Sequence, residues 1–280
     1  MADAKWSFAN LLLLPSALLL LLFLVLPLCA TVWLSLEPNA IVRFEGHGVG
    51  NYAYLGGKAY YVSVVTRTFR LAAESTVIAL LLGYPAALAL RGETERMAGT
   101  LSLLMTLPVL AGPLVVVLGW MILLSNGGPV LGPLVRWGVI GRVRWLGSET
   151  GIVIGVVHFV LPFVVLSLAS VVRGLSTPLL EAARSLGAGP LTRFRLVVFP
   201  LALPGLVSAT VIAFSLSMSS FVAPHYLGGP ADLTLTTLIA QFVLATFNGQ
   251  LAAAAATVLL VLMTVVIGVL TVGAARAVRT

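Results

Sequence analysis

Charged residues are scarce in this chain. Only 9% of its 280 residues are Asp, Glu, Lys or Arg and 60% are hydrophobic, whereas soluble domains average about 25% charged residues. The charge-free runs cover residues 6–36, 75–90, 97–135, 150–172, 196–231 and 233–275. This composition excludes a water-soluble globule, and the connections between the runs are too short for a soluble catalytic domain.

Cysteine and nucleotide-binding motifs are also nearly absent. The single cysteine, Cys29, excludes an intrachain disulfide and a cysteine-built metal site. His158 and His225 lack the paired spacing of metal ligands, and no Gly-x-x-x-x-Gly-Lys-Ser/Thr loop is present to hold phosphates. The net charge of +7 is spread between apolar runs without a basic stripe. We therefore expect no metal, no cofactor and no nucleic acid bound by this chain.

What the sequence does contain is a set of apolar runs of membrane-spanning length. A spanning helix needs about 20 apolar residues, because the hydrocarbon core is roughly 30 Å thick. The sequence predicts an all-α membrane protein with six transmembrane helices, at about 11–36, 71–90, 101–124, 151–172, 204–224 and 251–274. The first is read as an uncleaved anchor, because its apolar run exceeds the roughly 7–15 residues of a signal-peptide core. Leu233–Phe247 is too short for a span and is expected to be re-entrant or interfacial.

The placement of Lys and Arg predicts the orientation. If the N-terminus is cytoplasmic, nine of these residues fall inside and seven outside. Arg91 and Arg173 flank inner ends of spans closely, whereas Arg67 and Arg70 lie on the outer side and oppose the trend. The sequence therefore predicts cytoplasmic N- and C-termini.

The connection between spans four and five, residues 173–203, is polar but patterned. Ser176 or Thr177 can cap a helix that carries Pro178 in its first turn, and Gly187 suits the left-handed position that ends a helix. The sequence predicts a short helix at 178–186.

A second helix is expected to begin at Pro190 by the same logic. It should run until Pro200 and Pro204 bend the chain back into the membrane. The product is a helix hairpin on the cytoplasmic face. Glu181, Arg184 and Ser185 of its first helix remain exposed for a partner.

The stretch Glu181 to Gly187, EAARSLG, followed ten positions later by Val197-Val198-Phe199-Pro200, resembles the EAA signature of permease subunits of bacterial binding-protein-dependent ABC importers. Val197 and Phe199 are mild departures, since the family pattern has Ile and Leu there. The resemblance implies the type I importer permease fold, with a cytoplasmic coupling helix between spans four and five that binds the ATPase. In that role Glu181 would be the polar contact, Ala182 and Ala183 the close-approach surface with Arg184 beside them, and Gly187 the turn.

Shorter segments extend the resemblance to the spermidine/putrescine-type subgroup. They are Leu14-Pro15 with Pro27, Gly83-Tyr84-Pro85-Ala86 and Phe221-Val222-Ala223-Pro224 through Leu227-Gly228-Gly229-Pro230. That subgroup often has an acidic residue just before the phenylalanine, where this chain has Ser219 and Ser220. The resemblance therefore implies a polyamine-like or related organic solute, and it leaves iron open.

The same resemblance implies the domain organisation and the partners. Residues 1–60 would hold the N-terminal span and first periplasmic loop, and 61–280 the permease core with its coupling segment 173–203. The partners would be a second permease subunit, either a sister chain or a second copy, two cytoplasmic ATPase subunits, a periplasmic solute-binding protein and membrane lipid. ATP and Mg would be bound by the ATPase.

Three residues are candidates for the translocation path. Ser217 and Ser220 share a helix face at i, i+3, and hydroxyls can line a solute path without the cost of a charge. Glu74 is the acid nearest the middle of a predicted span and could meet a cationic solute. Arg70 lies one turn away, so an ion pair near the outer end is the favoured reading.

Two other functions compete with transport driven by an ATPase. An intramembrane serine protease of the rhomboid kind could use Ser176, which stands in a Gly-x-Ser triplet, with His158 or His225 as base. An ion-coupled secondary transporter would need several ion ligands within the membrane, and Glu74 alone does not provide such a set. Neither has a motif comparable to the one at Glu181.

Overall fold

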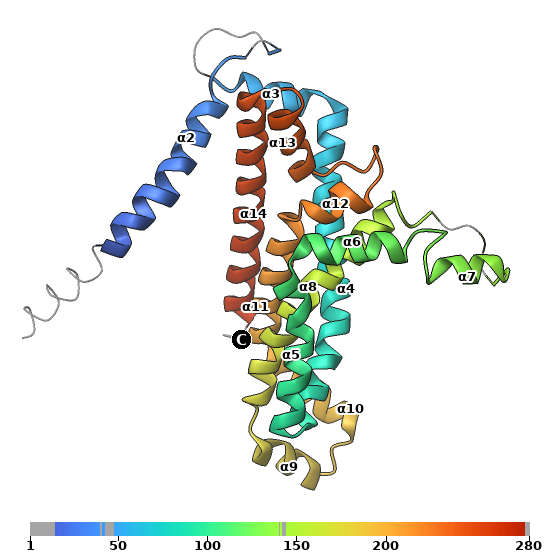
Figure 1. Ribbon diagram of the computed structural model, residues 1–280. Coiled ribbons are helices and arrows are strands. Elements are labelled where there is room, and N and C mark those ends of the chain that lie inside the picture. The colour runs from blue at the N-terminus through green and yellow to red at the C-terminus, as the bar shows by residue number, and fades with distance from the viewer. Residues whose placement is uncertain (1–14, 40, 43–47, 140, 142–143, 278–280) are drawn as a thin grey trace, which may run out of the picture. The chain divides into compact units, whose positions relative to one another are not determined.

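The computed structural model describes residues 15–39, 41–42, 48–139, 141 and 144–277, and every regular element within them is a helix (Figure 1). Among these described residues, five continuous helices are long and apolar enough to cross a membrane. They are Pro15–Ser35, Ala59–Gly92 (α4), Glu149–Arg173 (α8), Pro190–Met218 and Gly249–Gly273. A sixth candidate is the bent pair α5 (Glu95–Ala111) and α6 (Pro113–Leu123). The predicted all-α membrane architecture is confirmed.

The third predicted span, 101–124, is not one continuous helix but a bent pair of helices. α5 and α6 are bent by 95° relative to each other. Gly112, which separates them, has a φ of +81°, and Pro113 opens α6. A left-handed residue followed by a proline without an N–H interrupts the hydrogen-bond ladder of an α-helix, so the apolar run is split in two.

The fifth span also differs from the prediction, because it begins at Pro190. It runs through α10 (Pro190–Arg193), a π-helical turn η2 (Phe194–Val198) and α11 (Phe199–Met218) as one helix. The sequence predicts a bend at Pro200 and Pro204, which is wrong. The wide turn pairs the N–H of Phe199 with the carbonyl of Phe194, and Pro200 then falls in the first turn of α11, where its missing N–H is tolerated.

Shorter helices complete the chain. They are η1 (Leu21–Val25) and α2 (Leu26–Ser35) within the first span, α3 (Gly50–Gly57), α7 (Leu131–Arg136), α9 (Thr177–Ser185), α12 (Val222–Leu227) and α13 (Leu235–Leu244). The last span belongs to the long helix α14 (Gly249–Ala277). The short apolar helix expected within 233–247 is confirmed as α13.

The chain divides into two compact units. Unit 1 comprises Met1–Val62 with Leu238–Val261, and unit 2 comprises Ser63–Thr237 with Leu262–Thr280. In unit 1 the side chain of Asn51, in α3, donates to the carbonyls of Ser35 and Glu37, both at 2.8 Å. The Ser35 hydroxyl also lies 2.5 Å from that of Tyr52. These bonds hold α3 against the end of α2.

Unit 2 is built around α8. Its buried residues pack with those of α4 and α11 into one apolar cluster, in which Val160, Val164, Val165 and Leu168 are fully buried. Glycines permit this close packing: a Cβ on Gly205 of α11 would lie 2.6 Å from Cγ2 of Val171. Within unit 2, α9 and α10 lie at one end and α12 toward the other (Figure 1). We call these the α9 end and, after the first residue of α8, the Glu149 end.

Candidate functional site

The segment after α8 forms the predicted helix and turn. α9 follows α8 after three residues, with Ser176 at its N-cap position and Pro178 in its first turn. The Ser176 side chain makes no capping hydrogen bond within the described residues. At the other end Gly187 has a φ of +79°. Its N–H donates to the carbonyl of Arg184 at 3.0 Å, and that of Ala188 donates to Ala183 at 3.1 Å, which is the Schellman pattern.

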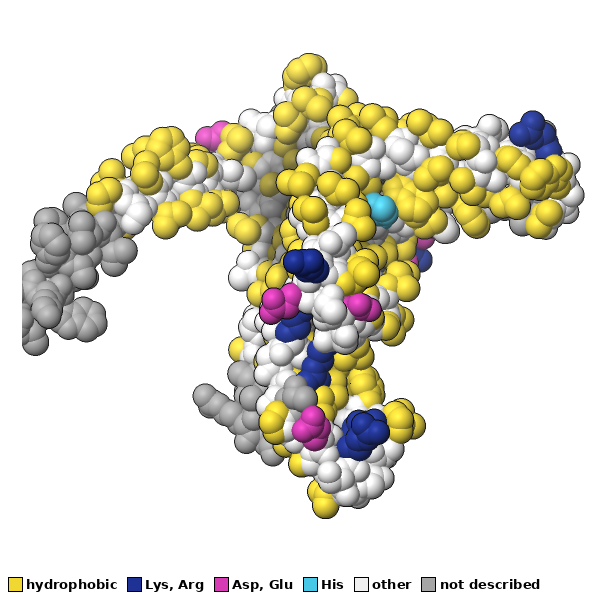
Figure 2. Space-filling view, turned by 60° about the horizontal axis from the view of Figure 1, so that its bottom comes forward, with side chains coloured by type: hydrophobic (Ala, Val, Ile, Leu, Met, Phe, Trp, Pro, Cys, Tyr) yellow, Lys and Arg dark blue, Asp and Glu magenta, His cyan; other side chains and the backbone are white. Residues whose placement is uncertain are grey.

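The surface of α9 and its C-terminal turn is exposed. Glu181, Ala182 and Arg184 are exposed, and Leu186 is 88% exposed beyond them. Figure 2, in which the α9 end comes forward, shows acidic and basic side chains standing among hydrophobic ones at that end. A mixed surface of exposed leucine, small alanines and single charges of both signs is suited to a protein partner, because it offers close approach together with polar contacts.

A hydrogen bond from α4 holds the three-residue connection between α8 and α9. Arg91, in the last turn of α4, donates from its guanidinium to the carbonyl of Leu175 at 2.9 Å. Leu175 stands between the end of α8 and the start of α9. Sequence reasoning treated Arg91 only as an orienting charge, because nothing local to residue 91 points to a partner 84 positions away.

The Glu149 end carries an ion cluster. Arg67 Nε lies 3.0 Å from Glu149 Oε1, and Arg70 pairs with the other oxygen of the same carboxylate. The ion pair predicted between Arg70 and Glu74 is present at 3.8 Å, with both side chains about half exposed. Sequence reasoning missed Glu149, the acid that joins both arginines. Its only local signal was an acid in the first turn of a helix capped by Ser148.

The two serines proposed for the path have different surroundings. Ser217 is 8% exposed, and its hydroxyl has no hydrogen-bond partner within the described residues. Ser220 is half-buried, and its carbonyl accepts a hydrogen bond from the hydroxyl of Thr236 at 2.7 Å.

Two other serines are exposed, namely Ser208 on α11 and Ser219 at its C-terminal end. Ser208 and Ser219 are eleven residues, or about three helical turns, apart and therefore lie on the same face of the helix. This face is exposed, and the sequence alone does not distinguish it from the buried face.

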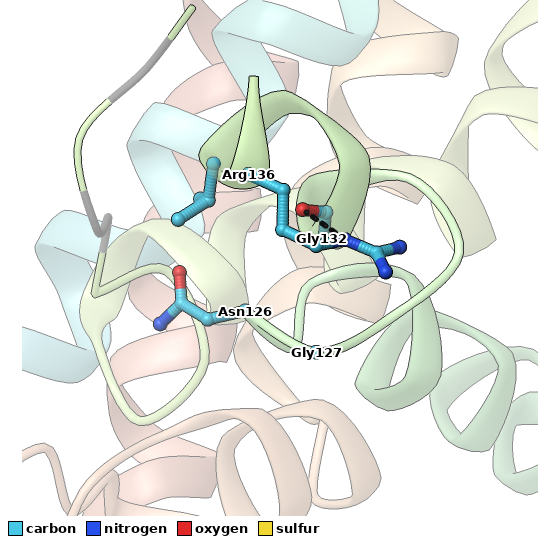
Figure 3. A pocket seen from close by; sticks show the side chains of 5 residues that line it. Asn126, Gly127, Gly132 and Arg136 are labelled. Atoms are coloured by element: carbon cyan, nitrogen blue, oxygen red, sulfur yellow. Dashed lines mark hydrogen bonds between the residues drawn. The ribbon is translucent and has the colours of Figure 1, made fainter. Parts of the chain in front are cut away.

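Pockets open at several places on the described part of unit 2. An apolar one of about 450 Å³ is lined by Val77, Leu80, Leu81, Tyr84, Pro85, Phe194, Phe199 and Leu206. Another, of about 630 Å³, lies beside Glu149 and Asp232. A third, of about 520 Å³, lies at α7, where Figure 3 shows the Arg136 side chain beside the carbonyl of Gly132. Within the described residues no group of three or more His, Cys, Asp or Glu side chains is placed to hold a metal ion.

The geometry does not assemble a serine protease site. His158 lies within α8 and packs edge-on against Trp120, and 15 residues of helix, roughly 22 Å, separate it from the end of α8. His225 stacks on Phe221 in α12. The carbonyl of Leu227, at the end of α12, accepts the N–H of Gly147 just before α8. His225 therefore lies at the opposite end of α8 from Ser176. Neither histidine therefore reaches the serine.

Comparisons with known proteins agree with the helical architecture. Residues 79–280 match the family model described as binding-protein-dependent transport system inner membrane component. The spermidine/putrescine transport system permease protein PotB of Haemophilus influenzae is 31% identical over 208 residues, which cover 74% of this chain and 73% of that protein. The molybdenum transport system permease protein ModB of Azotobacter vinelandii is 32% identical over 182 residues, covering 64% of this chain and 78% of that protein.

Solved structures share the fold. A bacterial ABC transporter that imports the acidic polysaccharide alginate has a chain that superposes with a TM-score of 0.78 at 17% identity, covering 98% of this chain and 96% of that one. A chain of the MetNI methionine ABC transporter in an inward-facing conformation gives a TM-score of 0.55 at 19% identity, covering 78% of this chain and 94% of that one. The architecture is that of type I ABC importer permeases. This chain belongs to the family of binding-protein-dependent transport system inner membrane components, which are transport permeases and not enzymes.

Proposed function

We propose that this chain is one of two permease subunits of an ATP-driven importer and that α9 is its coupling helix. The single observation that carries this proposal is the exposed α9 surface, ended by the Schellman turn at Gly187. Glu181 would bond donors on the ATPase, Ala182 and Ala183 would allow close approach, and Arg184 would border the contact.

The orientation follows from this assignment. The α9 end would face the cytoplasm, where the ATPase hydrolyses ATP with its own Mg, and the N- and C-termini would lie on the same side. The Glu149 end would face the periplasm and receive solute from a binding protein. The higher number of Lys and Arg residues on the proposed inner side supports this direction.

The solute is proposed to be polyamine-like or a related small organic molecule. Support comes from the likeness to permeases named for spermidine and putrescine. Within the described candidate spans, Glu74 is the one carboxylate more than a turn away from a helix end, and it is already paired with Arg70. Ser208 and Ser219 on the open face of α11 would then offer hydroxyls to the path, together with Ser220.

Reconstitution tests the function directly. The chain would be assembled in proteoliposomes with its second permease subunit, the ATPase and the binding protein. Uptake of labelled spermidine, putrescine and a neutral organic solute would then be measured. We expect uptake that requires ATP and stops with an ATPase variant unable to hydrolyse it. Uptake that persists with the inactive ATPase would instead identify an ion-coupled transporter.

A further inference from the structure

Two long helices of unit 2, α4 and α8, pack against each other between the α9 end and the Glu149 end. Leu71, Ala79 and Ala87 of α4 belong to the same buried cluster as Val160, Val164 and Leu168 of α8. In the middle, Gly83 brings the two backbones close, because a Cβ there would meet Val164 at 2.6 Å. Apolar packing resists separation of the two helices but is non-directional, so polar bonds at their ends add a directional constraint to it.

Polar contacts join the same two helices at the Glu149 end. The carboxylate of Glu149, in the first turn of α8, accepts from both Arg67 and Arg70 of α4. Arg67 Nη1 also donates to the carbonyl of Leu233 at 3.4 Å, in the segment before α13. The Arg67 and Glu149 side chains are only 23% and 34% exposed, so solvent screens this pair less than it would a fully exposed one.

The opposite end carries the second tie. Arg91 donates to Leu175 O at 2.9 Å, two residues beyond the end of α8 and two before α9 begins. Arg67 and Arg91 lie on one unbroken helix, 24 positions and roughly 36 Å apart. Glu149 and Leu175 span the length of α8 in the same way. The two helices are therefore fixed to each other at both ends as well as along their length.

We infer that Arg91 and Glu149 are positioning residues for energy coupling: they fasten α4 to α8 at both ends, so that displacement of α9 moves both helices as one strut. The inference rests on the proposed function of α9. Arg91 acts by holding the Leu175 carbonyl, in the connection from which α9 begins. Glu149 acts by holding Arg67 and Arg70, near the opposite end of α4. A guanidinium suits Arg91, because its planar set of donors fixes a direction that an ammonium does not.

The test measures coupling rather than folding. The reconstituted full complex would be assayed for solute imported per ATP hydrolysed, with the wild type, Arg91→Met and Glu149→Gln. Arg91→Met keeps an apolar stem without donors, and Glu149→Gln keeps the shape of the side chain without its charge. Arg96→Met and Glu95→Gln are the matched controls, because both residues are exposed at the start of α5 and make no ion pair among the described residues.

We expect each strut variant to lower the number of solute molecules imported per ATP by roughly tenfold, the factor that corresponds to losing one charge-assisted hydrogen bond. The rate of ATP hydrolysis and the yield of assembled complex should stay near wild type. Arg91→Lys should restore part of the ratio. In a double-mutant cycle, Arg67→Gln and Glu149→Gln should be less than additive, because the Arg67–Glu149 contact is lost in both, while each variant also loses one contact of its own.

Three outcomes would overturn the inference. One is a wild-type ratio in both strut variants, and another is full additivity of Arg67→Gln and Glu149→Gln. The third is a parallel fall of uptake, hydrolysis and assembly, with Arg91→Lys as poor as Arg91→Met, which would indicate a merely structural role. Failure of the proposed function would look different, since the wild-type complex itself would then show no ATP-dependent uptake or a Glu181 variant would remain coupled.

Discussion

Gly83 of α4 faces Val164 of α8 so closely that a Cβ added to the glycine would lie 2.6 Å from Cγ1 of the valine. Both positions are buried, and Val164 is completely enclosed. At that distance the Val164 side chain or one of the two helices must shift before a side chain fits at residue 83. The contact is thus a sensitive test of whether α4 and α8 pack as described.

We expect Gly83→Ala to destabilise the protein by about 1–3 kcal/mol, because overpacking of a tight core forces backbone shifts. The measurement is the thermal unfolding midpoint of the purified protein in detergent. Gly99→Ala is the matched control, since nothing lies within 4 Å of that position in α5 and alanine favours a helix over glycine by roughly 0.5–1 kcal/mol. Equal midpoints for the two variants would contradict the packing.

Glu181→Lys should uncouple ATP hydrolysis from uptake without disturbing the spans. Residue 181 is exposed on α9, so the substitution leaves the fold intact but reverses a charge at the proposed ATPase contact. We expect uptake to fall roughly tenfold or more, as truncating or reversing one partner of an interfacial charge pair commonly does. Glu181→Gln should show a smaller loss. Normal uptake by the lysine variant would count against α9 as the coupling helix.

Gly187→Ala should loosen the end of α9. An L-residue at the left-handed φ of +79° costs about 1–2 kcal/mol, and the two backbone bonds that close the turn depend on that conformation. Faster hydrogen exchange at the amides of Gly187 and Ala188 would report the change. Gly189→Ala is the control, because Gly189 has an ordinary φ of −64° and open space around it. It should leave the exchange rates unchanged.

Ser176→Ala should keep both stability and uptake, the former within about 0.5 kcal/mol. Its hydroxyl caps nothing within the described residues, although the residue holds the N-cap position of α9. Ser148→Ala provides the contrast, since the Ser148 hydroxyl accepts the N–H of Gly151 at the start of α8, and its loss should cost about 1 kcal/mol. Abolished activity in the Ser176 variant would revive the protease alternative.

The sequence predicted features whose causes are local. Pro178 and Gly187 delimit α9 because a ring-constrained first turn and a left-handed end are properties of single residues. The Arg70–Glu74 pair is one helical turn apart and was predicted for the same reason. Apolar runs of sufficient length identified the spans, since membrane thickness sets that length independently of tertiary structure.

Features that depend on distant parts of the chain could not be predicted in this way. Glu149 meets Arg67 across 82 positions, and no local pattern pairs them. Ser217 proved buried and Ser219 exposed, because which side of α11 faces the core is decided by its neighbours. The break at Gly112 is a further case. A glycine followed by a proline permits a kink, but those two residues do not determine how far the apolar run bends.

The π-helical turn at Phe194–Val198 sets the rotational phase between α10 and α11. A turn closed by i→i+5 bonds holds one more residue than an α-helical turn, and each residue of an α-helix accounts for about 100° of rotation. Deleting a single residue from this turn would restore a regular helix and rotate α10, which lies N-terminal to it, by roughly that angle relative to α11. The side of the helix from which the connection to α9 arrives therefore depends on one surplus residue in this turn.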